Sequence, residues 1–111
     1  MAKFVIRPEI NYHKEGDYEL LHAALKKRGM YRALRLTDTI TKKVDWYDLP
    51  TGTYIADLNL SVEQVKNLAS DGLQEIGKTN TDRARDYELS VFLWTDALCD
   101  LKINTDTSKR P

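Results

Sequence analysis

The apolar residues follow two different spacings along the chain, and the order of these spacings constrains the fold. Alternation with period two, typical of a strand with one buried face, occurs in residues 3–12, 30–36, 53–58 and 87–95. Helical spacing of three and four occurs in residues 17–29 and 61–77. The predicted order is therefore strand, helix, strand, strand, helix, strand.

With right-handed crossovers, this order predicts an α+β, ferredoxin-like βαββαβ domain over residues 1–96. Two helices would cover one face of a four-stranded antiparallel sheet. Residues 97–111 are then a C-terminal tail. We expect this tail to supply an extra, dimerising strand and then to be disordered, because its last part is polar.

Both predicted helices carry residues suited to their ends. Ser61 and Gln64 form a capping box, which is the clearest helix start in the chain, and Gly77 is expected to end that helix. Asp17 is expected to cap the first helix, and Gly29 suits the left-handed residue that follows its last turn.

Two of the predicted strands contain interruptions. Pro8 lies inside the first strand and cannot donate to a ladder, so this strand either bulges there or pairs on one side only. Residues 37–43 are predicted to form a hairpin loop. The return passage contains Pro50 and Gly52, which predicts a short extended piece at residues 44–47 before the main third strand.

The charges balance overall but are unevenly distributed. The chain has 17 basic and 17 acidic residues, so net charge gives no general affinity for nucleic acid or anionic lipid. Residues 26–43, however, contain seven cations and one acid, and residues 44–75 contain six acids and one lysine. Any affinity for polyanions must come from this local asymmetry.

The cations begin at the end of the first helix, where the helix terminus favours Lys26, Lys27 and Arg28. Arg32 and Arg35 continue the charge onto the next strand, which helix-end electrostatics does not explain. We therefore consider an RNA-binding surface made by Lys27, Arg28, Arg32 and Arg35. A capped helix end beside a solvated strand edge is the alternative.

Phe92 and Trp94 are expected on the sheet face that the helices leave open. They could stack on single-stranded bases, or form an interface with a dimer partner or with the tail. In the second case, Leu98 and Leu101 from the tail would contribute to the same interface.

Few residues suggest acid–base or metal chemistry. His22 lies within the apolar stripe of the first helix, so it is expected to be buried at least in part and is a weak candidate for proton transfer. The single cysteine, Cys99, has no partner for a disulfide, and no Cys/His cluster has metal-ligand spacing. We expect no cofactor and no metal.

The N-terminus lacks an apolar signal sequence and no apolar run could span a bilayer, so we expect a cytoplasmic protein without membrane contact.

Two segments, "DYELLHAALKKRGMYRAL" and "WYDLPTGTYIADLNLSVEQVKNLA", resemble the small enterobacterial and phage-associated proteins grouped with the GhoS endoribonuclease antitoxins. The resemblance covers residues 4–94. It implies a ferredoxin-like fold related to the CRISPR-associated acquisition nucleases, action on single-stranded RNA in a toxin–antitoxin or prophage system, and dimerisation by sheet pairing. It points to Arg28 and Arg32 as candidate catalytic residues.

The chain departs from the CRISPR-associated relatives at the end of the first strand. Where those proteins carry a metal-binding aspartate, this chain has Glu9, Ile10 and Asn11, so metal-dependent cleavage by that route is not expected. Two functions remain open: an RNA-binding protein with or without endoribonuclease activity, and a non-catalytic protein-interaction module of a mobile element.

Overall fold

The computed structural model describes residues 2–11, 15–37, 40–79, 87–94 and 103–111. Within these ranges the chain forms an α+β domain, which confirms the α+β part of the prediction. In chain order the elements are β1 (Ala2–Ile10), α1 (Asp17–Lys26), β2 (Met30–Tyr31), β3 (Ala33–Thr37), β4 (Val44–Asp48), β5 (Tyr54–Leu58), α2 (Val62–Thr79), β6 (Tyr87–Leu93) and the 3-10 helix η1 (Thr107–Lys109). None of the helices in these ranges is both long enough and apolar enough to cross a membrane.

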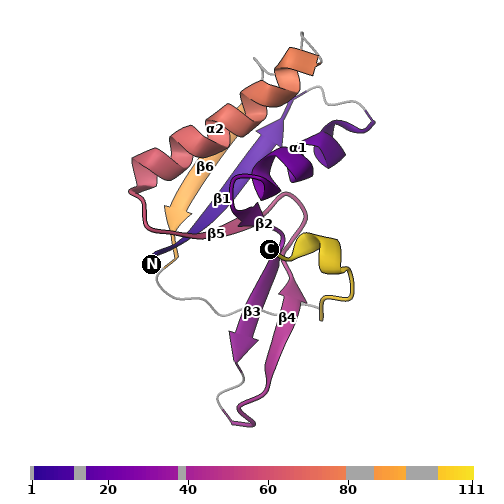
Figure 1. Ribbon diagram of the computed structural model, residues 1–111, viewed down its shortest axis with the longest axis vertical. Helices are drawn as coiled ribbons and strands as arrows, with labels where there is room; N and C mark the ends of the chain where they lie inside the picture. The colour runs from indigo at the N-terminus through magenta and orange to yellow at the C-terminus, as the bar shows by residue number, and fades with distance from the viewer. Residues whose placement is uncertain (1, 12–14, 38–39, 80–86, 95–102) are drawn as a thin grey trace.

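The main sheet has four strands in the order β2-β5-β1-β6, and every neighbouring pair is antiparallel. Both α1 and α2 lie on the same face of this sheet (Figure 1). A single apolar core fills the space between the helices and the sheet. It consists of Phe4, Ile6, Ile10, Leu21, Leu25, Met30, Tyr54, Ala56, Val65, Ala69, Leu73 and Ile76.

Strand β1 occupies the centre of the sheet and tolerates a proline there. It pairs with β5 over residues 2–6 and with β6 over residues 4–10. Pro8 therefore has a strand neighbour on one side only, as the missing N–H predicts.

The two helix starts differ in how well the sequence predicts them. At α2 the capping box is present, with Ser61 N donating to Gln64 Oε1 (2.8 Å) and Gln64 N donating to Ser61 Oγ (3.1 Å). At α1 the predicted cap is wrong, because Gly16 occupies the capping position with φ of 89° and Asp17 is the first helical residue. The sharp turn before α1 needs a left-handed residue, and glycine adopts that conformation without a Cβ penalty.

The helix ends also differ from one another. Gly29 has the predicted positive φ, 83°, in the turn after α1. Gly77 does not end α2, which continues to Thr79. A glycine inside a helix costs only about 1 kcal/mol relative to alanine, so it does not by itself stop a helix.

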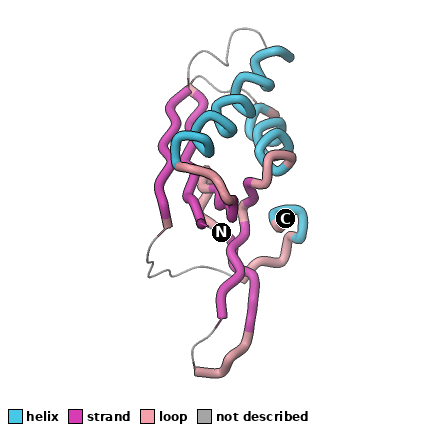
Figure 2. The backbone as a smooth tube through the Cα atoms, turned by 60° about the vertical axis from the view of Figure 1, so that its left-hand side comes forward, coloured by secondary structure: helices cyan, strands magenta, loops and turns pink. Residues whose placement is uncertain are grey.

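The predicted second strand is divided at Arg32. Its first part, β2, joins the main sheet beside β5, whereas β3 leaves that sheet and pairs with β4. The two strands form a hairpin that projects from the domain (Figure 2). The backbone of Arg32 explains the division: its N–H donates to Lys109 O (2.8 Å), and its carbonyl accepts from Leu49 N (3.0 Å).

Residues 103–111, here called the C-terminal segment, lie against the hairpin and α1 of the same chain. Ile103 forms a β-bridge with Tyr47, and Asn104 N donates to Trp46 O (2.9 Å). The sequence predicts disorder here, and the difference comes from these contacts with residues far away in the chain. Leu98 and Leu101, which we expected at a dimer interface, fall outside the described residues.

Candidate functional site

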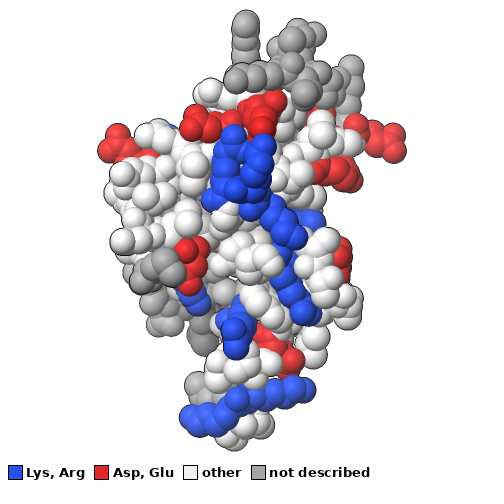
Figure 3. Space-filling view, in the orientation of Figure 1, with Lys and Arg blue, Asp and Glu red and all other residues white. Residues whose placement is uncertain are grey.

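Basic side chains gather in a band on one face of the domain. The band runs from the junction of α1 and α2, past the C-terminal segment, to the β3–β4 hairpin (Figure 3). The name basic band is used below for Lys26, Lys27 and Arg28 at the end of α1, Arg32 between β2 and β3, Arg35 on β3, and Lys109 in the C-terminal segment. The four residues of the predicted RNA-binding surface therefore belong to one band, but they occupy three separate positions along it.

Lys27 and Arg28 form the first position, at the end of α1. Lys27 Nζ lies 2.7 Å from Glu75 Oε1, and Arg28 Nη1 lies 2.9 Å from Glu75 Oε2 on α2. Arg28 also donates to the helix-end carbonyl of Ala24 (2.8 Å). Hydrogen bonds from Lys27 and then Arg28 lower the pKa of Glu75, so this acid stays ionised and offsets part of the local positive charge.

The second position is a pocket of about 280 Å³ between α1, β2 and the C-terminal segment, here called the His22 pocket. It is lined by Glu19, His22, Ala23, Lys26, Met30, Tyr31, Arg32, Ser108 and Lys109. Lys26 Nζ donates to Ser108 O (2.7 Å), which joins α1 to the C-terminal segment at the rim. Three cations and one acid line this pocket, so it favours an anionic ligand.

His22 is half-buried in this pocket and hydrogen-bonds through Nδ1 to the hydroxyl of Tyr54, which is fully buried. Burial and, next, the nearby Arg32 lower the pKa of His22 from 6.5 to about 4. Burial also raises the pKa of Tyr54. Both side chains are therefore neutral at pH 7. An efficient general base has a pKa near the working pH, so His22 is poorly suited to that role.

Arg35 is the third position, on β3. It is exposed, and its backbone neighbour across the hairpin is the half-buried Trp46. The guanidinium of Arg110 lies 5.6 Å from the centre of the Trp46 ring. Two cations thus lie beside one aromatic ring on this part of the surface, a combination that proteins use to bind single-stranded nucleic acid.

Sequence reasoning did not identify Lys109 and Ser108 as pocket residues. Both lie in the polar stretch "TSKRP", which offers no periodicity that would place it in the fold. Lys26 was apparent only as part of the basic run. The three become neighbours of Arg32 because the C-terminal segment folds back on α1.

The open face of the main sheet carries a second, larger pocket of about 540 Å³. Arg7, Glu9, Glu88, Ser90 and Phe92 line its sheet side. Phe92 is 54% exposed, whereas Tyr87, Leu89 and Val91 on the same strand pack against the core. This confirms that Phe92 points away from the helices; Trp94, just after β6, is half-buried.

In the part of the chain that the structure describes, no group of three His, Cys, Asp or Glu side chains is arranged to hold a metal ion. Comparison of the chain with protein-family models, curated proteins and solved structures finds no match. The resemblance to the GhoS group therefore stays a prediction that rests on the two quoted segments.

Proposed function

We propose that the protein binds single-stranded RNA along the basic band, with a backbone phosphate in the His22 pocket. The observation that carries this proposal is the pocket itself, in which Lys26, Arg32 and Lys109 converge from three parts of the chain. The net charge of the protein is zero. Attraction to a polyanion must therefore be local, and the band supplies it.

Single-stranded RNA fits better than a duplex because aromatic side chains accompany the cations. Tyr31 lines the His22 pocket beside Arg32, and Trp46 lies next to Arg35 on the hairpin. Bases of a single strand can stack on such rings, whereas paired bases inside a duplex cannot reach them.

Binding has more support than cleavage. Cleavage of RNA needs groups that accept and donate protons near neutral pH, and the lowered pKa of His22 makes it a weak acceptor. Arg28, one of the two candidates that the resemblance implies, is engaged by Glu75 and by a helix-end carbonyl. The endoribonuclease activity implied by the resemblance is tested in the same experiment as binding.

We also propose that the main domain is ferredoxin-like, as the resemblance implies. When β3 and β4 are treated as an inserted hairpin, the remaining elements follow the order β1, α1, β2, β5, α2, β6. The central positions of β1 and β5 in the sheet support this arrangement.

The test is binding and cleavage of a labelled single-stranded RNA pool at low and high salt, with and without magnesium. Wild type is compared with an Arg28→Ala, Arg32→Ala double variant and with Lys3→Ala, which removes one exposed cation from β1, outside the band. We expect salt-sensitive binding that the double variant loses and Lys3→Ala keeps. Each lost phosphate contact should reduce the slope of log K against log salt by about 0.7. Absence of binding by wild type would refute the proposal.

A second candidate function is protein docking through the open sheet face. Phe92 is 54% exposed on the open face near the end of β6, an edge strand of the described main sheet, and its neighbour Leu93 is 50% exposed on the opposite face of that strand. Edge strands with exposed apolar side chains pair readily with another chain. A dimer in analytical ultracentrifugation that Phe92→Asp converts to a monomer would support sheet-mediated dimerisation, and a wild-type monomer at all concentrations would exclude it.

A further inference from the structure

The C-terminal segment is hydrogen-bonded to Arg32 and Lys26, two residues that line the His22 pocket. Arg32 N donates to Lys109 O (2.8 Å), and Lys26 Nζ donates to Ser108 O (2.7 Å). One bond comes from the backbone and the other from a side chain, and they come from different elements. These two bonds hold the segment against the pocket. Its residues Ser108 and Lys109 form one wall of the pocket.

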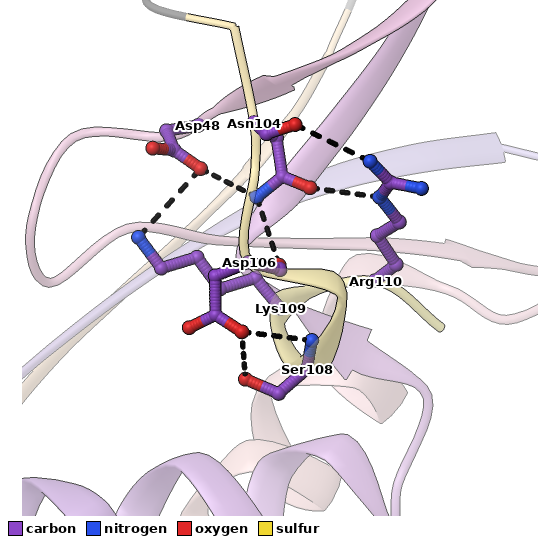
Figure 4. A network of polar contacts seen from close by, with 6 residues as sticks. All are labelled: Asp48, Asn104, Asp106, Ser108, Lys109 and Arg110. Atoms are coloured by element: carbon purple, nitrogen blue, oxygen red, sulfur yellow. Dashed lines mark hydrogen bonds and ion pairs between the residues drawn. The ribbon is translucent and has the colours of Figure 1, made fainter.

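A buried asparagine fixes the position of the segment. Asn104 is only 4% exposed, and its Nδ2 donates to Asp48 Oδ1 (2.6 Å) and to Asp106 O (3.0 Å). Its Oδ1 accepts from Arg110 Nε (2.7 Å) (Figure 4). These side-chain bonds join the start and the end of the segment to β4, in addition to the backbone contacts of Ile103 and Asn104 with the hairpin.

The turn that presents Lys109 is shaped locally. Asp106 Oδ1 accepts from Ser108 N (3.0 Å) and from Ser108 Oγ (2.6 Å), which caps η1. Because the Ser108 hydroxyl donates to Asp106, it is engaged within the turn. Lys109 is then the basic residue of the turn that lines the pocket, and its ammonium group lies toward Asp48 on β4.

Lys109 is held near the pocket only loosely. Its Nζ lies 3.6 Å from Asp48 Oδ1, which is longer than an ordinary hydrogen bond, and its side chain is 26% exposed. Asp48 already accepts a 2.6 Å hydrogen bond from Asn104 at the same oxygen. An entering anion can therefore compete for the ammonium group of Lys109 without breaking a tight ion pair.

We propose that the C-terminal segment is an integral wall of the phosphate site and that Lys109 binds a backbone phosphate of the RNA together with Lys26 and Arg32. This inference rests on the proposed RNA-binding function. A phosphodiester has two unesterified oxygens, and cations from three directions can contact both. The pocket, at about 280 Å³, has room for one such group.

The first test compares RNA binding by wild type, Lys109→Ala, Lys109→Arg and the control Lys3→Ala over a range of salt concentrations. We expect Lys109→Ala to weaken binding about 5- to 10-fold at low salt and to reduce the salt slope by about 0.7. Lys109→Arg should restore both values, and Lys3→Ala should change the affinity less than about twofold. Circular dichroism checks folding, and Lys109→Gln replaces Lys109→Ala if that variant unfolds.

The second test separates this inference from the proposed function. Inorganic phosphate is titrated into wild type and Lys109→Ala while the imidazole resonances of His22 are followed by NMR. A saturable shift that Lys109→Ala abolishes supports the phosphate site even if RNA does not bind. RNA binding with the same affinity and slope in Lys109→Ala overturns the inference and leaves the proposed function standing. Absence of both RNA binding and a phosphate shift in wild type overturns both.

Discussion

Gly72 of α2 lies directly against Leu25 of α1, so that a Cβ atom at residue 72 would come within 2.8 Å of Leu25 Cδ2. Leu25 is fully buried and has little space to move. The glycine therefore permits the close approach of the two helices. The same approach brings Glu75, less than one turn further along α2, to Lys27 and Arg28.

This contact predicts that Gly72→Ala destabilises the protein. In an exposed helix the change would be favourable by about 1 kcal/mol, because alanine has the higher helix propensity. Here the added methyl group must displace Leu25, and overpacking of a core costs about 1–3 kcal/mol. We expect a net loss of about 1 kcal/mol in urea unfolding. Asp71→Ala, on the exposed side of α2, is the control and should not destabilise; a raised midpoint for Gly72→Ala would contradict the prediction.

The helices show how much local sequence determines. The capping box of Ser61 and Gln64 and the apolar stripe of α2 are visible in the sequence because all their partners lie within a few residues. The role of Gly72 is not visible, since its partner Leu25 belongs to another element. Sequence alone therefore marks Gly72 as a defect in a helix, and only the packing explains it.

The candidate site was predictable in part for the same reason. The basic run that contains Arg28 and Arg32 is obvious from charge counting. The division of the second strand is not, because the partner of the Arg32 backbone is Lys109, close to the end of the chain. A polar terminal stretch carries no pattern that would predict such a contact, so the wall of the His22 pocket could not be predicted.

The lowered pKa of His22 predicts a pH-dependent stability. The folded protein holds this group neutral, with a pKa of about 4 against 6.5 for an unperturbed histidine. Between these values the unfolded chain binds more protons than the folded one. The contribution of His22 to the free energy of unfolding is therefore fully present above pH 6.5 and is lost as the pH is lowered toward 4. Allowing for solvent around a half-buried ring, we expect a loss of about 1–2 kcal/mol by pH 4.

Urea unfolding of wild type and His22→Gln between pH 7 and pH 5 checks this prediction. Glutamine cannot titrate, so its stability should change less over this range than that of wild type. The part of the range below pH 6.5 is the most informative, because the unfolded chain protonates His22 there, whereas the pKa values of Glu75 and Asp106 are lowered from ordinary values that already lie below pH 5. Parallel curves for the two proteins would show that His22 does not contribute.

The ion pairs at Glu75 predict a variant that binds RNA more tightly. Glu75→Gln removes the carboxylate that engages Lys27 and Arg28, which frees both cations for phosphate contacts. We expect about 2- to 5-fold tighter binding of single-stranded RNA and a steeper salt dependence. The effect on stability should be small, since Lys27 and Glu75 have side chains 63% and 40% exposed.

Glu63→Gln is the matched control for this experiment, because it removes one exposed negative charge from the first turn of α2. If both variants gain affinity equally, the gain reflects net charge and not release of Lys27 and Arg28. Weaker binding by Glu75→Gln would mean that Glu75 holds the two cations in the orientation that the RNA requires.

Asn104 should control how firmly the C-terminal segment covers the His22 pocket. Asn104→Ala removes three side-chain hydrogen bonds that join Asp48, Asp106 and Arg110. The main core does not include this residue, so we expect local opening of the segment and not global unfolding. The amide of Arg32 reports on this opening because it donates to Lys109 O. Its hydrogen-exchange protection should fall about 10- to 30-fold, corresponding to about 1.4–2 kcal/mol.

Two controls accompany this measurement. Amides of β5 should keep their protection, and Thr105→Ala, an exposed change in the same segment, should leave the protection of the Arg32 amide unaffected. If Arg32 exchanges equally slowly in Asn104→Ala, the segment is held by its backbone contacts alone and Asn104 has no positioning role.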